Sequence, residues 1–224
     1  MKRIKRWLKW AVLGLLLAGI LYVCWLFAQV VWWNYANPRE TAFMVERLAV
    51  LRDKDPGAVL RQTWVSYENI SKSLKLAVVA AEDDRFLDHR GFDWDSMTQA
   101  LEKNLKRGKT VVGGSTISQQ LAKNLFLSSN RSYLRKIKEA TITVMIEAVW
   151  SKKRILEVYL NVAEWGDGVF GAEAAAHHYY GISAAQLNAS QAARLAVMLP
   201  NPRVYQKHFP PRLEAHAQRV EKRM

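Results

Sequence analysis

The sequence is poor in cysteine, in acidic residues and in the alternating pattern of β-strands. Its 224 residues contain one cysteine, Cys24, so no disulfide can form within the chain. Lysine and arginine number 33 against 20 aspartates and glutamates, and the net charge of +13 indicates an anionic partner. Apolar and polar residues alternate only briefly, at residues 63–67, so the sequence gives little evidence for strands. These shortages exclude a disulfide-stapled fold and an all-β fold.

Charged residues are absent between residues 11 and 33, and this gap predicts a transmembrane helix. At about 1.5 Å per residue, a helix of this length reaches roughly 35 Å, enough to cross a bilayer core. A cleaved signal peptide is the alternative, but the apolar run exceeds a signal core and no small-x-small cleavage site follows it. Arg39 and Glu40 follow the run, whereas five cations precede it: Lys2, Arg3, Lys5, Arg6 and Lys9. This bias predicts a cytoplasmic N-terminus.

The chain is therefore expected to have three parts. These are a basic cytoplasmic segment at residues 1–10, a transmembrane helix at 11–33 and one extracytoplasmic domain at 40–224. Because the basic domain is then outside the cell and tethered to a membrane, phospholipid headgroups or a phosphate-bearing substrate are favoured as its anionic partner. Nucleic acid, the usual partner of a basic chain, is not expected.

Apolar residues at three-to-four spacing dominate the exported part and predict a mainly α domain. We expect helices at about 40–52, 71–84, 94–107, 116–127, 133–150, 152–161, 170–180 and 190–199, and a further one from Arg212 to Met224. The expected N-caps are Ser71, Asp93, Ser115, Ser132 and Ser151, and the expected helix ends include Gly181 and Pro200. Residues 106–114 hold three glycines and three cations and predict a mobile basic loop of the kind that often gates substrates.

Three consecutive acids, Glu82, Asp83 and Asp84, end the helix predicted at 71–84, where they oppose the helix dipole. A catalytic carboxylate would explain this position, because the dipole and the preceding apolar run would raise its pKa toward the range of a general base. The alternative is that these acids are solvated or pair with Arg85 and Arg90. The position of these acids alone does not decide between a catalytic and a purely structural role.

Glu139 is a second isolated acid, in the helix predicted at 133–150. Arg135 stands four residues before it, which is the spacing of an ordinary surface ion pair. However, Ile142, Thr143 and Ile146 follow at helical spacing, so the face of the helix that carries Glu139 is apolar rather than solvated.

Five motifs occur in order between about residues 74 and 202. They are EDDRFLDHRG at 82–91, GGSTISQQLAKN at 113–124, RKIKE at 135–139, ILEVYLN at 155–161 and GVFGAEAAAHHYYG at 168–181. Together these motifs resemble those of glycosyltransferase family 51. Because no Ser-x-x-Lys motif of a penicillin-binding transpeptidase occurs, the chain is similar to the monofunctional members of that family, and we expect no transpeptidase activity.

The resemblance implies a lysozyme-like, mainly α glycosyltransferase domain preceded by a single transmembrane helix. It implies polymerisation of lipid II into β-1,4-linked glycan by inverting attack of a GlcNAc 4-hydroxyl on MurNAc C1, with release of polyprenyl diphosphate. The implied catalytic residues are Glu82 as the base and Glu139 in a supporting role that stays open. The implied substrate-binding residues are Asp83, Phe86, His89, Ser115, Thr116, Gln119, Gln120, Lys123, Asn124, Arg131, Arg135 and Lys136. Among them, Asp83, Phe86 and His89 are expected to shape the first motif, and Ser115 is also expected to cap its helix.

The implied partners are lipid II, the growing lipid-linked strand, the membrane and other wall-synthesis or division proteins. The implied location is the bacterial inner membrane, with a single pass and a periplasmic catalytic domain. No cofactor is required by the resemblance, which leaves open a divalent cation, Mg²⁺ or Mn²⁺, at Glu139.

Two other functions are compatible with parts of this pattern. A wall-cleaving muramidase would also use a lone glutamate in a lysozyme-like cleft, but it has no pyrophosphate to hold, so Lys123 and Arg135 would matter little. A non-catalytic membrane scaffold of the wall-synthesis machinery would tolerate Glu82→Gln.

Overall fold

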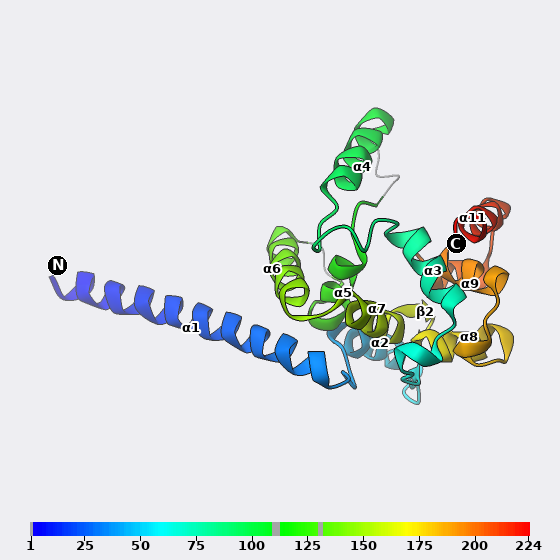
Figure 1. Ribbon diagram of the computed structural model, residues 1–224. Helices are drawn as coiled ribbons and strands as arrows, with labels where there is room; N and C mark the ends of the chain where they lie inside the picture. Colours follow the sequence, from blue (N-terminus) through cyan, green and yellow to red (C-terminus); the bar gives the residue numbers. More distant parts are fainter. Residues whose placement is uncertain (1, 109–112, 130–131) are drawn as a thin grey trace. The chain divides into compact units, whose positions relative to one another are not determined.

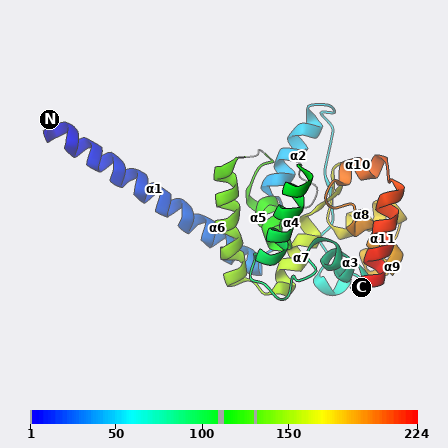
Figure 2. The same ribbon diagram turned by 90° about the horizontal axis from the view of Figure 1, so that it is seen from above.

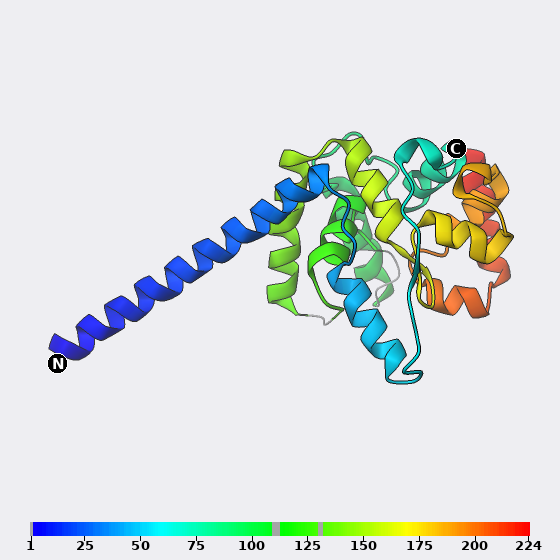
Figure 3. The ribbon, with the colours of Figure 1, turned by 90° about the horizontal axis from the view of Figure 1, so that it is seen from below.

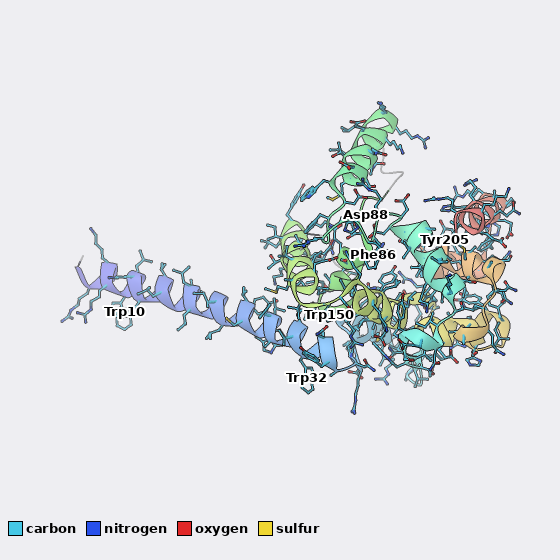
Figure 4. The ribbon with its side chains drawn as sticks, viewed as in Figure 1. Trp10, Trp32, Phe86, Asp88, Trp150 and Tyr205 are labelled. Carbon is cyan, nitrogen blue, oxygen red and sulfur yellow. The ribbon has the colours of Figure 1, made fainter. Side chains whose placement is uncertain are left out.

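The computed structural model describes residues 2–108, 113–129 and 132–224 and divides the chain into two compact units, Met1–Pro38 and Arg39–Met224. The first unit is one helix, α1 (Lys2–Tyr35), which is longer at both ends than the predicted apolar run. Within Lys5–Tyr35 an 18-residue stretch has a mean hydropathy of 2.4, so by length and composition the helix can cross a membrane. Trp10 and Trp32, labelled in Figure 4, are exposed near its two ends, as in the aromatic belts of membrane-spanning helices.

The second unit is mostly helical in its described residues, which confirms the mainly α prediction. Its helices are α2 (Ala42–Arg52), α3 (Lys72–Glu82), α4 (Trp94–Arg107), α5 (Ile117–Phe126), α6 (Tyr133–Val149), α7 (Lys152–Val162), α8 (Ala172–Tyr180), α9 (Ala189–Ala196), α10 (Pro202–Lys207) and α11 (Pro211–Arg223), with short 3-10 helices at Tyr67–Asn69 and Ala184–Gln186. A small sheet has the strand order β1 (Arg61–Gln62), β3 (Val169–Phe170), β2 (Glu164–Gly166). β1 pairs parallel and β2 antiparallel with β3.

The core of the second unit centres on α5, whose Ile117, Leu121 and Leu125 are buried. Each such side chain contributes about 1.5–3 kcal/mol by leaving water. α5 packs against α2, α6 and α7, while α3 packs against α9 and α11. Figures 1 and 2 show these two groups of helices side by side, and α2 lies along α5 in Figure 3. In Figure 1, α4 extends away from both groups.

Most predicted N-caps are confirmed, and one is wrong. The side chains of Ser71, Asp93, Ser132 and Ser151 each accept a hydrogen bond from a backbone N–H in the first turn of their helix. The cap of α5 is Thr116 and not Ser115. Thr116 accepts from the N–H of Gln119, and the Gln119 side chain accepts from the N–H of Thr116, so this reciprocal capping box outweighs the serine one residue earlier.

The brief alternation at residues 63–67 does not correspond to a strand, because strand pairing in this region is confined to β1, just before it. Val65 bonds to a side chain instead: its N–H donates to Asn161 Oδ1 and its C=O accepts from Asn161 Nδ2, both at 2.9 Å. Neither this contact nor the strands β2 and β3 could be predicted from the local alternation of apolar and polar residues.

Several helix ends differ from the prediction. The helix expected at 71–84 ends at Glu82, where Asp83 turns to an extended backbone, and the helix expected at 190–199 ends at Ala196 in a series of turns before Pro200. The helix expected to start at residue 170 starts at Ala172, and Gly181 ends it as predicted. α10 was not predicted, and residues 109–112 of the predicted loop lie outside the described residues.

Two glycines with positive φ let segments approach closely around the site. Gly91 (φ +88) follows α3, and a Cβ there would lie 2.8 Å from Cγ2 of Thr143 on α6. Gly171 (φ +83) precedes α8, and a Cβ there would lie 2.7 Å from the carbonyl oxygen of Asn161 at the end of α7. Any other residue would be strained in this conformation and would also push the neighbouring helix away.

Candidate active site

Glu82 is the last residue of α3, and its side chain is partly buried. Gln120 of α5 donates from Nε2 to Glu82 Oε2 at 2.6 Å. Burial raises the pKa of Glu82 above its ordinary value, and the hydrogen bond from Gln120 and the charge of Lys123 offset part of this rise. The described contact is thus with a neutral amide, and the carboxylate has an increased affinity for a proton.

Asp83 and His89 join the end of α3 to the start of α5. The buried Asp83 carboxylate accepts from His89 Nε2 at 2.8 Å and from the backbone N–H of Ile117 at 3.0 Å. His89 Nδ1 accepts from the N–H of Gly91 at 3.1 Å, so His89 donates through Nε2 and is a structural, hydrogen-bonded residue. Burial raises the pKa of Asp83, while these two donors oppose the rise. This linkage fixes the turn that carries Glu82 against α5.

Phe86, labelled in Figure 4 beside Asp88, lies in the same turn and is 1% exposed. The ammonium of Lys152 stands 4.6 Å above its ring and also donates to Glu147 at 2.8 Å. Ser118 of α5 donates to the same carboxylate. Ser118, Glu147 and Lys152 were not predicted from the sequence, and they form a second layer that supports α5 from behind.

Glu139 is 3% exposed, so its predicted apolar surroundings are confirmed. It nevertheless makes the ion pair that its spacing suggested: Arg135 Nη1 donates to Oε2 at 3.0 Å, and Lys136 Nζ donates to Oε1. Arg135 Nε is buried and has no hydrogen-bond partner among the described residues. An anion bound beside Glu139 would provide the missing acceptor.

Two pockets adjoin at Ser115, which lines both. The first, of about 420 Å³, is lined by residues of α2, α5 and α6 and of the segments around α7 and α10. They include Phe43, Ser115, Gln119, Gln120, Lys123, Asn124, Ser129, Arg135, Lys136, Glu139, Tyr159, Glu164 and Arg203. The second, of about 500 Å³, is lined by residues of α3, α4 and α11 that include Glu82, Asp83, Asp84, Asp93, Lys103, Thr116, His216 and Arg223. The carboxylate of Glu82 thus faces one pocket, and the cations of α5 and α6 face the other.

Lys123 of α5 interacts electrostatically with both carboxylates, Glu82 and Glu139. Burial lowers its pKa, while the negative charges of Glu139 and Glu82 raise it and Arg135 lowers it. The two acids offset only part of the effect of burial, and the pKa of Lys123 stays below its ordinary value.

The structure brings most of the predicted site residues together. The first pocket contains eight of them: Ser115, Gln119, Gln120, Lys123, Asn124, Arg135, Lys136 and Glu139. Glu82, Asp83 and Thr116 line the second pocket, Phe86 and His89 lie in the turn behind Glu82, and Arg131 lies outside the described residues. Sequence reasoning missed Tyr159, Glu164 and Arg203. Tyr159 stands inside the fourth motif, but nothing in the motif indicated its partner.

Glu164 is a buried acid at the end of the first pocket. Arg47 of α2 donates to Glu164 Oε1 at 3.1 Å and to Asp167 at 2.5 Å, and Arg203 lies 3.6 Å from Glu164 Oε2. Burial raises the pKa of Glu164, and the two arginines oppose this rise. These ion pairs tie α2 and α10 to β2.

Comparisons with known proteins agree with this site. A family model described as Transglycosylase matches residues 50–224. The chain is 63% identical over 224 residues to a biosynthetic peptidoglycan transglycosylase of Azoarcus sp. (strain BH72), covering 100% of this chain and 97% of that protein. It is 62% identical over 205 residues to a protein of the same name from Aromatoleum aromaticum, covering 92% and 89%.

These matches show that the chain is an enzyme that transfers glycosyl groups, with the lysozyme-like fold expected from its motifs. It belongs to the transglycosylase family, which confirms the family inferred from the five motifs.

Proposed function

We propose that the chain is a peptidoglycan glycosyltransferase of bacterial cell-wall synthesis that polymerises lipid II into β-1,4-linked glycan. One observation carries the proposal: the Glu82 carboxylate, which accepts a hydrogen bond from the Gln120 amide, lies next to a pocket lined by cations. This pairing suits a reaction that removes a proton from a sugar hydroxyl and releases a pyrophosphate. Both relatives described above are named for biosynthetic peptidoglycan transglycosylation, and the chain covers most of each.

Glu82 is the general base of the proposed reaction. A sugar hydroxyl is a poor nucleophile, so a base must take its proton as it attacks. In this scheme the GlcNAc 4-hydroxyl of the acceptor gives its proton to Glu82, and its oxygen forms a bond to MurNAc C1 of the donor. The bond from C1 to the pyrophosphate breaks on the opposite face, so configuration inverts and polyprenyl diphosphate leaves. The raised pKa of Glu82 increases its strength as a base.

Lys123, Arg135 and Lys136 stabilise the negative charge that develops on the departing pyrophosphate. They line one pocket and are fixed before substrate arrives, which is the arrangement that makes electrostatic stabilisation effective. The buried, partnerless Nε of Arg135 supports an anion at this position. Glu139 holds Arg135 and Lys136 in place and counts as catalytic support rather than as a proton acceptor.

The residues around Glu139 do not fit a divalent ion, Mg²⁺ or Mn²⁺. Both oxygens of the Glu139 carboxylate already accept hydrogen bonds from cations, Arg135 and Lys136. No group of three His, Cys, Asp or Glu side chains is arranged to hold a metal in the described part of the chain. We therefore assign no step of the proposed reaction to a metal ion.

The substrate is proposed to enter from the membrane in which α1 is anchored, with the N-terminus in the cytoplasm. α4 exposes Trp94, Leu101 and Leu105, and α6 exposes Tyr133 and Leu134, each by 59% or more. Exposed apolar residues of this size favour contact with lipid. A substrate with a polyprenyl tail stays in the bilayer, so an anchored enzyme meets it at a high effective concentration.

The full-length chain in detergent or liposomes, incubated with purified lipid II and separately with isolated cell wall, tests this proposal. We expect lipid II to be converted into long glycan and no fragments to be released from the wall. Release of wall fragments without consumption of lipid II would identify a muramidase, and inertness toward both would identify a scaffold.

A further inference from the structure

Tyr159 begins a chain of two hydrogen bonds that ends at Glu82. Its hydroxyl donates to Gln120 Oε1 at 2.9 Å, and Gln120 Nε2 donates to Glu82 Oε2 at 2.6 Å. We propose that Tyr159 is a positioning residue that fixes the orientation of the Gln120 amide, so that the amide presents its N–H, and not its C=O, to Glu82. This inference rests on the proposed function of Glu82 as the base.

The chemistry of the three groups allows one arrangement when Glu82 is ionised. A carboxylate only accepts hydrogen bonds, so the amide must turn its NH₂ group toward it. The amide oxygen then faces Tyr159, whose hydroxyl must donate. Tyr159 is 1% exposed, and its burial, together with the charges of Glu82 and Asp83, raises the pKa of the hydroxyl well above its usual value. Tyr159 therefore keeps its proton and remains a donor.

Tyr159 stands on a rigid part of the fold. Its helix, α7, packs directly on α5, which carries Gln120. Two residues further on, Asn161 is fully buried and binds the N–H and the C=O of Val65. Gly171 packs closely against the carbonyl of Asn161. Because its helix is held in this way, the hydroxyl of Tyr159 stays in place and does not follow a rotation of the amide.

Removing the hydroxyl would let the Gln120 amide turn its C=O toward a protonated Glu82 and accept a hydrogen bond from its O–H. This adds a favourable arrangement for the protonated form alone, so Glu82 would stay protonated up to a higher pH. The other charged and titratable groups that face Glu82 or its pocket are unchanged by this substitution: Asp83, Asp84, Asp93, Lys103, Lys123, His216 and Arg223. Any change of the pH profile is then attributable to the amide.

Tyr159→Phe in the full-length chain tests this inference through kcat/KM for lipid II as a function of pH. We expect the acid limb to move up by about one pH unit, the size of a weakened hydrogen bond to a charged group, with a nearly parental plateau at high pH. Tyr179→Phe is the matched control, because Tyr179 also donates its hydroxyl to one protein acceptor, the carbonyl of Trp165 at 2.8 Å. The control should leave the limb unmoved. A parental profile for Tyr159→Phe overturns the proposal.

A second variant shows whether Tyr159 acts through Gln120. Gln120→Met removes the amide at similar side-chain length and should move the acid limb in the same direction. This variant tests the inference even if Tyr159→Phe is too unstable to assay. Adding Tyr159→Phe to Gln120→Met should cause no further shift. A further shift would contradict the inference that Tyr159 acts on Glu82 through Gln120. Undiminished activity of Glu82→Gln would instead refute the proposed base, so the two failures are distinguishable.

Discussion

The surroundings of Glu82 and Glu139 differ in kind, although both are carboxylates on the helices that frame the pockets. Glu82 accepts a hydrogen bond from the neutral amide of Gln120, whereas Glu139 accepts from two cations, Arg135 and Lys136. Both oxygens of Glu139 are thus occupied by the side chains of Arg135 and Lys136, which suits a residue that holds cations in place. The amide of Gln120 is a neutral donor, so it places no positive charge against the Glu82 carboxylate. From this difference we propose that Glu82 takes the proton and that Glu139 aligns the cations.

The largest effect expected from this difference is on activity. Glu82→Gln should lower kcat for lipid II polymerisation by roughly 10²- to 10⁴-fold, the usual contribution of a general base. Glu139→Gln keeps the side-chain shape and should cost at most about 10²-fold, through misplaced cations. Initial rates with labelled lipid II measure both. The opposite ranking would break the comparison.

Removing a cation should have the next largest effect. Arg135→Ala is expected to lower kcat by about 10²- to 10³-fold, because it deletes a preorganised donor to the leaving pyrophosphate. Lys138→Ala, which removes an exposed cation on the same helix outside the pocket linings, is the matched control. Equal losses for the two variants would show that only the overall charge of α6 matters.

The stability of the folded chain should respond oppositely at the two acids. Glu139→Gln leaves Arg135 and Lys136 beside an uncharged side chain, which we expect to cost about 2 kcal/mol, less than for a fully buried pair because both cations are partly exposed. This corresponds to a fall in Tm of about 4–8 °C for a chain of this size. Calorimetry of the full-length chain in detergent measures the fall, and an unchanged Tm would mean that Glu139 does not hold the two cations.

The smallest predicted effect is a gain of stability in Glu82→Gln. Burial raises the pKa of Glu82 in the folded chain, so ionising this residue destabilises the fold as pH rises through that raised value. Glutamine carries no charge and should raise Tm at neutral pH by about 2–4 °C, equivalent to about 1 kcal/mol. The difference should vanish at acid pH, where Glu82 is protonated in both the folded and the unfolded chain. A lower Tm at neutral pH would contradict the burial argument.

The sequence predicted those parts of the fold that depend on nearby residues. Caps such as Ser71 and Asp93 are confirmed because a cap bonds within its own first turn. The alternating residues 63–67 form no strand, because the backbone of Val65 bonds to Asn161, 96 residues away. No local pattern encodes such a distant partner.

The candidate site shows the same limit. Its motifs supplied Glu82, Gln120 and Lys123 in order, and the structure brings these residues together. The hydroxyl of Tyr159 behind Gln120 and the ion pair between Arg47 and Glu164 depend on how α7 and α2 pack, so the sequence carried no sign of either.

Proton transfer to Glu82 is tested most directly by the pH dependence of single-turnover lipid II polymerisation in the parent and in Glu82→Gln. For the parent, the rate should fall tenfold for each pH unit below the pKa of Glu82, because only the ionised carboxylate accepts a proton. The residual rate of Glu82→Gln should lack this acid limb. An acid limb of the same midpoint and slope in Glu82→Gln would contradict the assignment of Glu82 as the base.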